Sequence, residues 1–534
     1  MHLQRLFSLA RALLLASLLA APGALLQPVA RAAETAQSWY LKGFKLQQEF
    51  HTLEALEAYK HALALDPFHA RAHYEIGWSY WILENWLEVV RHWELAQEAK
   101  LNVPDLSEYL AMARERMAGK LEPLERPPLH TRASGGGVTL ELVARFQHYD
   151  PSPADAADHF DDHVFSPKSV QIAPDGARAY VQALEGRATI VYDAQALAKL
   201  SVIAHDFGPE QARLFDAAES AAWAPRFPQG EAPAAFNQYE GKPVEGVFTH
   251  GGRYLWVSHY RRSFDELGVL PSSVAIIDTR QGAIVRVMQS GPIPKFMAAS
   301  PDGHWLAVVH WGDNTVGLID IRGDDPAAFR HAGEIVVERR LPLELERKVN
   351  RDRYCGLCLR GAVFTADSRT LLVARMGGGG IAVLDVAARK HIGSVQGQKP
   401  TPRHLLLSRD GSMLYVGSNS SGYVATYRAT ELVAAAQAGT QRLKPLAEVR
   451  TGEGTRTIAL SPDERLLFAA VNRGSKVLAL DARSLTKLVE IPTDSFPVGL
   501  AVSPDGRRVW VTAQGYKLRG GNAVTVYDVT RAGG

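Results

Sequence analysis

Basic side chains recur at one position of a repeat that occupies residues 138–534. The position lies five residues before the Ser, Thr or Ala that closes a short apolar run. Its basic occupants are Lys168, Lys295, Arg360, Arg403 and Arg456, and the two remaining copies carry Val244 and Val498. Because the fork of a guanidinium matches the geometry of carboxylate and phosphate, this set predicts a positive ring that binds an anion.

Imidazole groups accompany the ring in three successive copies. The next apolar run of each copy ends in His259, His310 or Arg375, and His404 directly follows Arg403. We expect Arg375 to join the ring and the three histidines to act as orienting donors. The alternative is a scaffolding role, in which each Arg bridges neighbouring repeats through backbone carbonyls or Asp side chains.

Two cysteines, Cys355 and Cys358, stand just before Arg360 and are the whole cysteine content of the chain. Three interpretations stay open: a local disulfide, a metal site completed by His310, or a redox-active pair. Leu359 occupies the position after Cys358 where covalent haem attachment would need a His. We assign no cofactor and expect none.

Acidic residues are scarce at the predicted ring. Glu245 is the acid that stands near the equivalent position, so hydrolysis supported by a hard metal ion is disfavoured. The chain also lacks the Gly-x-Ser-x-Gly, phosphate-loop and His-Glu-x-x-His motifs.

The repeat itself predicts the element that must position these side chains. The unit has an apolar strand ending in Ser, a Pro-Asp-Gly turn, a second strand, a short loop and a third strand ending in Asp, and its clearest copies begin at Phe296 and Pro497. The turns fall at Asp175, Gly251, Asp302, Asp367, Asp410, Asp463 and Asp505. Seven copies of such a unit predict an all-β seven-bladed β-propeller over residues 138–534.

The second-strand remnants Tyr415-Val416 and Trp510-Val511-Thr512 give the repeat a family likeness. It resembles the YVTN-repeat family of lactonase-like and YncE-like propellers. The resemblance implies the fold and says little about function. The last copy lacks an outer strand, and we expect residues 138–146 to supply it and close the ring.

A small all-α region over residues 36–118 precedes the propeller, with residues 119–137 expected as a linker. Two copies of a 34-residue pattern resemble TPR repeats; their matching residues are Trp39, Gly43, Ala55, Tyr59, Ala62 and Pro67, then His73, Gly77, Trp93 and Ala96. The resemblance implies a groove lined by first-helix aromatics, which would bind a protein partner. These residues are Tyr40, Phe44, Tyr74, Trp78 and Trp81. The alternative is that they pack inside the molecule.

Residues 1–32 read as a signal peptide with a basic start, a short apolar core and cleavage near Ala32. Its removal takes away Arg5, Arg11 and Arg31 and no acid, which brings 59 basic and 57 acidic residues into balance. A near-neutral protein has no bulk attraction to nucleic acid. We expect a periplasmic protein without a membrane span.

Together these features predict an exported binding or scaffold protein rather than an enzyme. The propeller would recognise an anionic small molecule or an acidic peptide, and the TPR-like module would contact a second protein. The alternative is a metal-dependent or redox enzyme centred on Cys355, Cys358 and His310. A purely structural role in an envelope assembly is the third possibility.

Overall fold

The structure is a computed structural model that describes residues 35–49, 51–82, 85–103, 106–121, 126–227, 232–265, 267–342, 350–352, 354–440, 442–515 and 520–532. The signal peptide expected over residues 1–32 lies outside them. The chain divides into two compact units, Met1–Leu106 and Ser107–Gly534. Among the described residues, no helix is both long and apolar enough to cross a membrane.

The first unit is a set of paired helices. They are α2 (Ala36–Gln48), α3 (Thr52–Leu65), α4 (Ala70–Ile82) and α5 (Trp86–Glu98). Thr35 starts α2 with a capping box, since its side chain accepts from the backbone N–H of Ser38 at 3.1 Å. Gly43 lies against the ring of Tyr59, and Gly77 against the indole of Trp93, so a Cβ at either glycine would overlap the ring. These glycines let each helix pair approach closely.

The second unit begins with helix α6 (Leu106–Leu121) and continues as a propeller. Its strands form seven successive sheets, each of which is antiparallel from the inner to the outer strand. The first strands of successive sheets lie side by side, and that of the last sheet lies beside that of the first, so the ring is closed. The predicted seven-bladed β-propeller with a small N-terminal helical region is therefore confirmed.

Blades 1 to 6 each take four consecutive strands. From inner to outer strand, blade 1 contains β4 (Pro167–Ile172), β5 (Arg178–Ala183), β6 (Ala188–Asp193) and β7 (Ala198–Ala204), and blade 2 contains β10 (Pro243–Thr249), β11 (Tyr254–His259), β12 (Ser272–Asp278) and β13 (Ala283–Ser290). Blade 3 contains β14 (Pro294–Ala299), β15 (Trp305–His310), β16 (Thr315–Asp320) and β17 (Arg330–Val336), and blade 4 contains β18 (Leu359–Phe364), β19 (Thr370–Arg375), β20 (Ile381–Asp385) and β21 (Lys390–Val395). Blade 5 contains β22 (Pro402–Leu407), β23 (Met413–Ser418), β24 (Tyr423–Arg428) and β25 (Ala447–Arg450), and blade 6 contains β26 (Thr455–Leu460), β27 (Leu466–Val471), β28 (Lys476–Asp481) and β29 (Lys487–Pro492).

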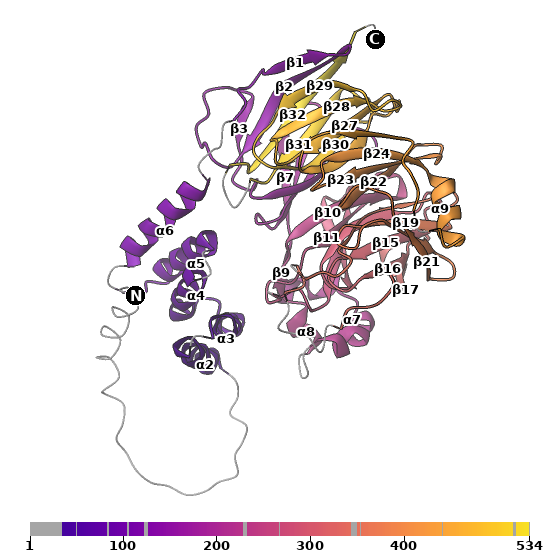
Figure 1. The fold of residues 1–534 in the computed structure, drawn as a ribbon. Coiled ribbons are helices and arrows are strands. Elements are labelled where there is room, and N and C mark those ends of the chain that lie inside the picture. Colours follow the sequence, from indigo (N-terminus) through magenta and orange to yellow (C-terminus); the bar gives the residue numbers. More distant parts are fainter. Residues whose placement is uncertain are drawn as a thin grey trace, which may run out of the picture. The chain divides into compact units, whose positions relative to one another are not determined.

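Blade 7 combines the two ends of the propeller chain. It contains β30 (Pro497–Val502), β31 (Arg508–Ala513), β32 (Ala523–Arg531) and, as its outer strands, β2 (Val138–Gln147) and β1 (Arg132–Gly135). Strand β3 (Asp158–Phe160) runs parallel to β2. In Figure 1 the purple β1 and β2 lie beside the yellow β32.

The segment 119–137, expected as a linker, contains the end of α6 and the strand β1. In β1, Ala133 and Ser134 pair with Leu140 and Thr139 of β2. The division between the two compact units falls after Leu106, so nearly all of α6, which lies within the helical region predicted over residues 36–118, belongs to the second unit.

The Ser-Pro-Asp-Gly turns are held by a repeated hydrogen-bond pattern. In blade 3, Ser300 Oγ donates to Asp302 Oδ1 at 2.5 Å and accepts from the backbone N–H of Trp305 at 2.9 Å. The glycine of such turns has positive φ, as at Gly303 with +73°. These local bonds explain why the motif recurs at the start of the second strand.

Short elements interrupt the blades. Between blades 1 and 2 lie β8 (Asp206–Phe207), η2 (Pro209–Leu214), α7 (Ala217–Trp223), η3 (Ala224–Arg226), α8 (Pro233–Phe236) and β9 (Tyr239–Glu240); elsewhere lie η4 (His250–Gly252), η5 (Pro326–Ala328) and α9 (Ala429–Gln437).

Candidate functional site

Every first strand of the propeller has the same irregularity just after its first residue. In blade 1, Pro167 pairs with Ala183 and Ser169 with Gln182, so Lys168 between them is left out of the ladder. A one-residue register shift also follows the first residue of the other six inner strands, and in blades 4 and 6 the pairing resumes one residue later. A bulge of this kind turns the extra residue away from the regular alternation of the strand. The predicted ring positions are these bulge residues.

The bulges bring all five predicted cations to one cavity of about 340 Å³. Its wall is completed by Tyr260, Trp311 and Asp352, with further contributions from blades 1 and 2. A second cavity of about 590 Å³ is lined mainly by residues of the inner strands. Lys168, Arg360 and Arg456 line both cavities, so these cations lie between them.

Lys295 differs from the other four cations because its carboxylate partner is much closer and its ammonium group lies over two aromatic rings. Its ammonium group forms a short ion pair with Asp352 and lies 4.0 Å from the centre of the Trp311 ring and 5.1 Å from that of Tyr260. Burial lowers the pKa of Lys295 to about 7, although Asp352 acts in the opposite direction. This side chain is held as part of the cavity wall.

The remaining cations, Lys168, Arg360, Arg403 and Arg456, form what we call the channel cluster. Arg360 and Arg403 are only 6% and 8% exposed, and Lys168 and Arg456 are half-buried. Among the described residues, the one ion pair of the cluster joins Arg360 Nη2 to Glu245 Oε2 at 3.8 Å. The cluster therefore gathers more positive than negative charge in a place that water reaches poorly.

Electrostatic repulsion inside the cluster appears in the pKa values. Burial and then the charge of Arg456 and Arg360 hold the pKa of Lys168 well below its ordinary range. Burial, followed by repulsion from Arg360, lowers the pKa of Arg456 to about 9. The pKa of Arg403 is also lowered, by burial and by its two guanidinium neighbours. Each shift means that an additional negative charge would be stabilising.

Neutral groups hold the cluster in place. Lys168 Nζ donates to Gln514 Oε1 at 3.1 Å, and Arg403 Nη1 donates to Met376 Sδ at 3.3 Å. Arg360 Nη1 donates to the backbone carbonyl of Lys295 in the neighbouring blade. Arg360 thus makes one of the inter-blade contacts expected for a scaffolding Arg while it also lines the cavity.

Arg375 does not join the cluster. Its Nη2 pairs with Glu338 Oε1 at 2.9 Å, and it lines neither channel cavity. The reason is its place at the end of the second strand of blade 4, opposite Leu359 and outside the bulge.

Two of the three predicted donor histidines are directed into the blades instead of the channel. His259 Nδ1 lies 2.7 Å from Ser273 Oγ, and His310 Nδ1 lies 2.7 Å from Thr315 Oγ1. Each therefore bonds to the third strand of its own blade. His310 lines a separate cavity of about 270 Å³ with Trp223.

His404 is the exception among the histidines. It lines the larger channel cavity beside Arg360, and its Nδ1 has no hydrogen-bond partner among the described residues. Burial, and then repulsion from Arg360 and Arg403, lowers its pKa to about 3. A neutral His404 could still accept or donate one bond to a ligand in the channel.

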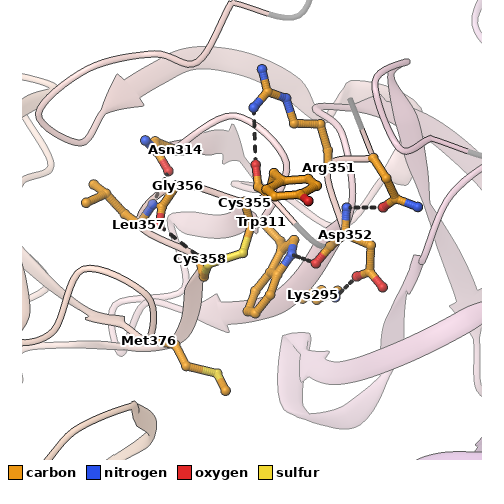
Figure 2. The surroundings of a disulfide bond; sticks show 12 residues. Lys295, Trp311, Asn314, Arg351, Asp352, Cys355, Gly356, Leu357, Cys358 and Met376 are labelled. Carbon is orange, nitrogen blue, oxygen red and sulfur yellow. Dashed lines mark hydrogen bonds and ion pairs between the residues drawn. A yellow bond between two sulfur atoms is a disulfide. The ribbon is translucent and has the colours of Figure 1, made fainter. Parts of the chain in front are cut away.

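Cys355 and Cys358 form a disulfide, the first of the three alternatives for this pair. Figure 2 shows that the loop lies beside Trp311, which separates it from the Lys295–Asp352 pair. Leu357 N donates to Asn314 Oδ1 at 3.0 Å, and Gly377 N donates to Leu357 O at 3.0 Å. The loop thus bonds to the turns between the second and third strands of blades 3 and 4, and these turns contain Trp311 and Met376.

In the disulfide, neither sulfur is a thiolate that could bind a metal ion. Within the described part of the chain, one group has the spacing of metal ligands, namely Asp161, Asp162 and His163. Lys199 Nζ already lies 2.6 Å from Asp161 Oδ1 there. His310 lies neither at the disulfide nor at this group, so Cys355, Cys358 and His310 do not form one centre.

In the helical unit, the five aromatic residues of the predicted groove pack largely among themselves and on the second helices. Tyr40 and Trp78 are buried, whereas Phe44, Tyr74 and Trp81 are half-buried. The Trp78 ring centre lies 5.0 Å from that of Trp93 in α5. Much of this row therefore stabilises the helix pairs.

Sequence reasoning missed Asp352, Trp311 and Met376. They lie in loops of blades 3 and 4 that the repeat does not place. The spacing of the repeat found the cations because the bulge recurs, but it carries no signal for side chains contributed by loops.

Comparison with known proteins gives no family for this chain. No family model matches, and no curated protein matches. Among solved structures, the Cps50 (Swd1) β-propeller domain of Myceliophteria thermophila is similar with 14% identity over 68% of this chain and 97% of that one, at a TM-score of 0.48. Kuenenia stuttgartiensis hydrazine synthase is similar with 16% identity over 71% of this chain and 99% of that one, at a TM-score of 0.46.

Proposed function

We propose that this protein is a binding or scaffold protein whose propeller recognises an anionic ligand, or an acidic segment of a partner, at the channel cluster. The observation that supports the proposal most directly is the convergence of Lys168, Arg360, Arg403 and Arg456 on one cavity. Among the described residues, this group has Glu245 as its one ion-pair partner.

The physical argument is the cost of burying like charges. An ionised group loses its hydration on burial and regains the lost free energy only if a counter-charge and hydrogen bonds replace the water. Three guanidinium groups beside one carboxylate are under-compensated. A bound carboxylate or phosphate would supply the missing charge, and Arg can bind it with two parallel hydrogen bonds.

The test is anion binding by isothermal titration calorimetry at low ionic strength, with phosphate, citrate and a short oligoglutamate peptide as probes. Arg403→Gln and Arg456→Gln should each weaken binding of the preferred probe by about tenfold or more. Arg465→Gln is the matched control, because the Arg465 side chain is 79% exposed on the same blade as Arg456. Equal binding by all four proteins would contradict the proposal.

We also propose that the helical unit binds a protein partner, as its resemblance to TPR repeats implies. Support comes from large apolar side chains exposed on this unit, above all Phe68 at 83% and Leu65 at 56%. A photo-crosslinking residue at position 68 should capture a partner in cells, whereas the same residue at the exposed propeller position 465 should not.

Export to the periplasm is the remaining part of the proposal. It is supported by the pattern of residues 1–32 and by the disulfide, which oxidising compartments favour. Mass spectrometry of the protein recovered from the periplasm should give Ala33 as its first residue. Recovery from the cytoplasm alone, with an intact N-terminus, would contradict export.

A further inference from the structure

Glu245 holds a particular place in the channel. It follows the bulge residue Val244 in blade 2, yet its carboxylate pairs with Arg360 of blade 4 at 3.8 Å. Gln171 of blade 1 donates to its other oxygen at 3.4 Å. The ion pair therefore joins blades 2 and 4 across the channel and does not involve blade 3.

Glu245 also lies on one side of the cluster. It lines the larger channel cavity together with Lys168, Arg360 and Arg456, but it does not line the cavity of about 340 Å³. That smaller cavity is lined by the same three cations, by Arg403, and by the carboxylates of Glu185 and Asp352, which pair with Lys242 and Lys295. The Glu245 carboxylate thus approaches the cations from one side and leaves their other side open to a ligand.

The charges can be counted from the described residues. Glu245 is attracted to all four members of the channel cluster, Lys295 is paired with Asp352, and Glu185 is paired with Lys242 at 2.7 Å. With Lys168 charged, four positive charges face one negative charge; with Lys168 neutral, three do. The empty cavity therefore keeps an excess of two or three positive charges.

We propose that Glu245 is the internal counter-ion of the channel cluster and that the ligand is a small oxyanion carrying at least two negative charges. This inference rests on the proposed function and names its ligand class. A monoanion would leave one or two positive charges uncompensated in a buried place, whereas a dianion or trianion would balance them.

The size of the cavity narrows the class further. Pockets for small organic ligands start at about 300 Å³, so a cavity of about 340 Å³ suits a di- or tricarboxylate or a simple phosphate monoester. The Lys295 ammonium group lies over the ring faces of Trp311 and Tyr260. These two rings therefore bound the cavity on one side and limit its width.

Removing the charge of Glu245 should have two effects of opposite sign. Glu245→Gln keeps an oxygen for the Gln171 hydrogen bond but leaves the cations without their internal partner. The empty protein should lose stability, seen as a Tm several degrees lower. Anion affinity should rise, by roughly tenfold for each negative charge on the probe, because Coulomb interaction scales with that charge.

The experiment measures affinities of acetate, malonate, citrate and methyl phosphate at pH 7.5 and fixed low ionic strength, together with Tm without ligand. In the natural protein we expect affinity to rise from acetate to malonate to citrate. Methyl phosphate is compared with malonate to tell whether phosphate or carboxylate is preferred. Glu464→Gln is the matched control, since Glu464 lines the same cavity and accepts from the backbone N–H of Arg409.

The outcomes separate the two proposals. Acetate binding as tightly as citrate would overturn the ligand class but leave anion recognition intact, and so would a Glu245→Gln protein whose gain is equal for every probe. Weaker binding by Glu245→Gln would overturn the counter-ion role. No binding by any probe would overturn both. If Glu245→Gln does not fold, the double variant Glu245→Gln/Arg456→Gln must recover stability, because it removes one charge of each sign.

Discussion

Arg145 and Asp494 form a buried ion pair, with Arg145 Nε 3.0 Å from Asp494 Oδ2, although 349 positions separate them in the chain. Arg145 belongs to β2, the strand that the N-terminal part of the propeller contributes to blade 7. Asp494 lies in the loop just before β30. Tyr149 OH donates to the second oxygen of Asp494 at 3.0 Å. The pair joins the two ends of the ring.

Breaking this pair should destabilise the propeller strongly. Asp494→Asn leaves the buried Arg145 with Asp158, 3.4 Å from its Nη1, as the remaining carboxylate, which should cost about 3 kcal/mol. Urea unfolding followed by tryptophan fluorescence measures the loss. Asp528→Asn is the control, because Asp528 pairs with Arg508 on the same sheet but is 44% exposed, so its loss should stay below about 1 kcal/mol. Equal costs for the two variants would refute a special role for the closing pair.

Loss of the disulfide should have a moderate effect on stability and a larger one on the site. The loop it closes is short, so the variant Cys355→Ser/Cys358→Ser should lose only about 2 kcal/mol. Anion affinity should also fall, because Trp311 packs against Cys355 and its ring contacts the Lys295 ammonium group. Calorimetry with and without a dithiol reductant measures both effects in the natural protein. Unchanged affinity after complete reduction would show that the loop does not support the cavity.

Stability should fall as the pH drops below about 6.5. Burial lowers the pKa of His205 and His404 to about 3 and that of His310 to about 4. In this range the unfolded chain binds protons that the folded chain does not, so each such His removes up to about 1.4 kcal/mol per pH unit. His310→Gln should make the pH dependence shallower, and His304→Gln, at an exposed site, should not. Identical slopes would be the contrary result.

Anion binding should weaken as the pH rises above neutrality. The pKa of Lys168 is held low by burial and by its cationic neighbours, and burial brings that of Lys295 to about 7. Lys295 therefore loses its charge near neutrality, before Arg456, whose pKa is about 9, and the low pKa of Lys168 acts in the same direction. We expect citrate affinity to fall between pH 6.5 and 8 by about tenfold for each charge lost.

The double variant Lys168→Arg/Lys295→Arg tests the origin of that dependence. Arg stays protonated over this range, so the variant should bind citrate with nearly constant affinity. A pH dependence as steep as that of the natural protein would assign the titration to another group.

The fold could be predicted from sequence because its signals repeat. Ser461, Asp463 and their equivalents form the same turn in several blades, and each copy reinforces the others. The closing strand was also accessible, since the last copy ends without an outer strand. The strand at the end of the expected linker could not be predicted from sequence. β1 is a short strand of small and polar residues, and it takes its conformation from its partner β2.

The site could be predicted in part for the same reason. Lys168 and Arg403 occupy a position that the backbone repeats, so the register alone brought them together. The direction of His259 and His310 was not accessible, because it depends on the Ser273 and Thr315 hydroxyls of the third strand. Asp352 was missed because its loop has no counterpart in the other blades.

The recurrent bulge separates the shape of the channel from its chemistry. Blades 2 and 7 carry Val244 and Val498 at the bulge with the same register shift as the blades that carry Lys or Arg. The backbone therefore adopts this geometry whatever side chain it presents. Seven such positions form a circular set in which one side chain can be exchanged without rebuilding its neighbours, so the ligand preference of this scaffold can be rewritten one blade at a time, in evolution or by design.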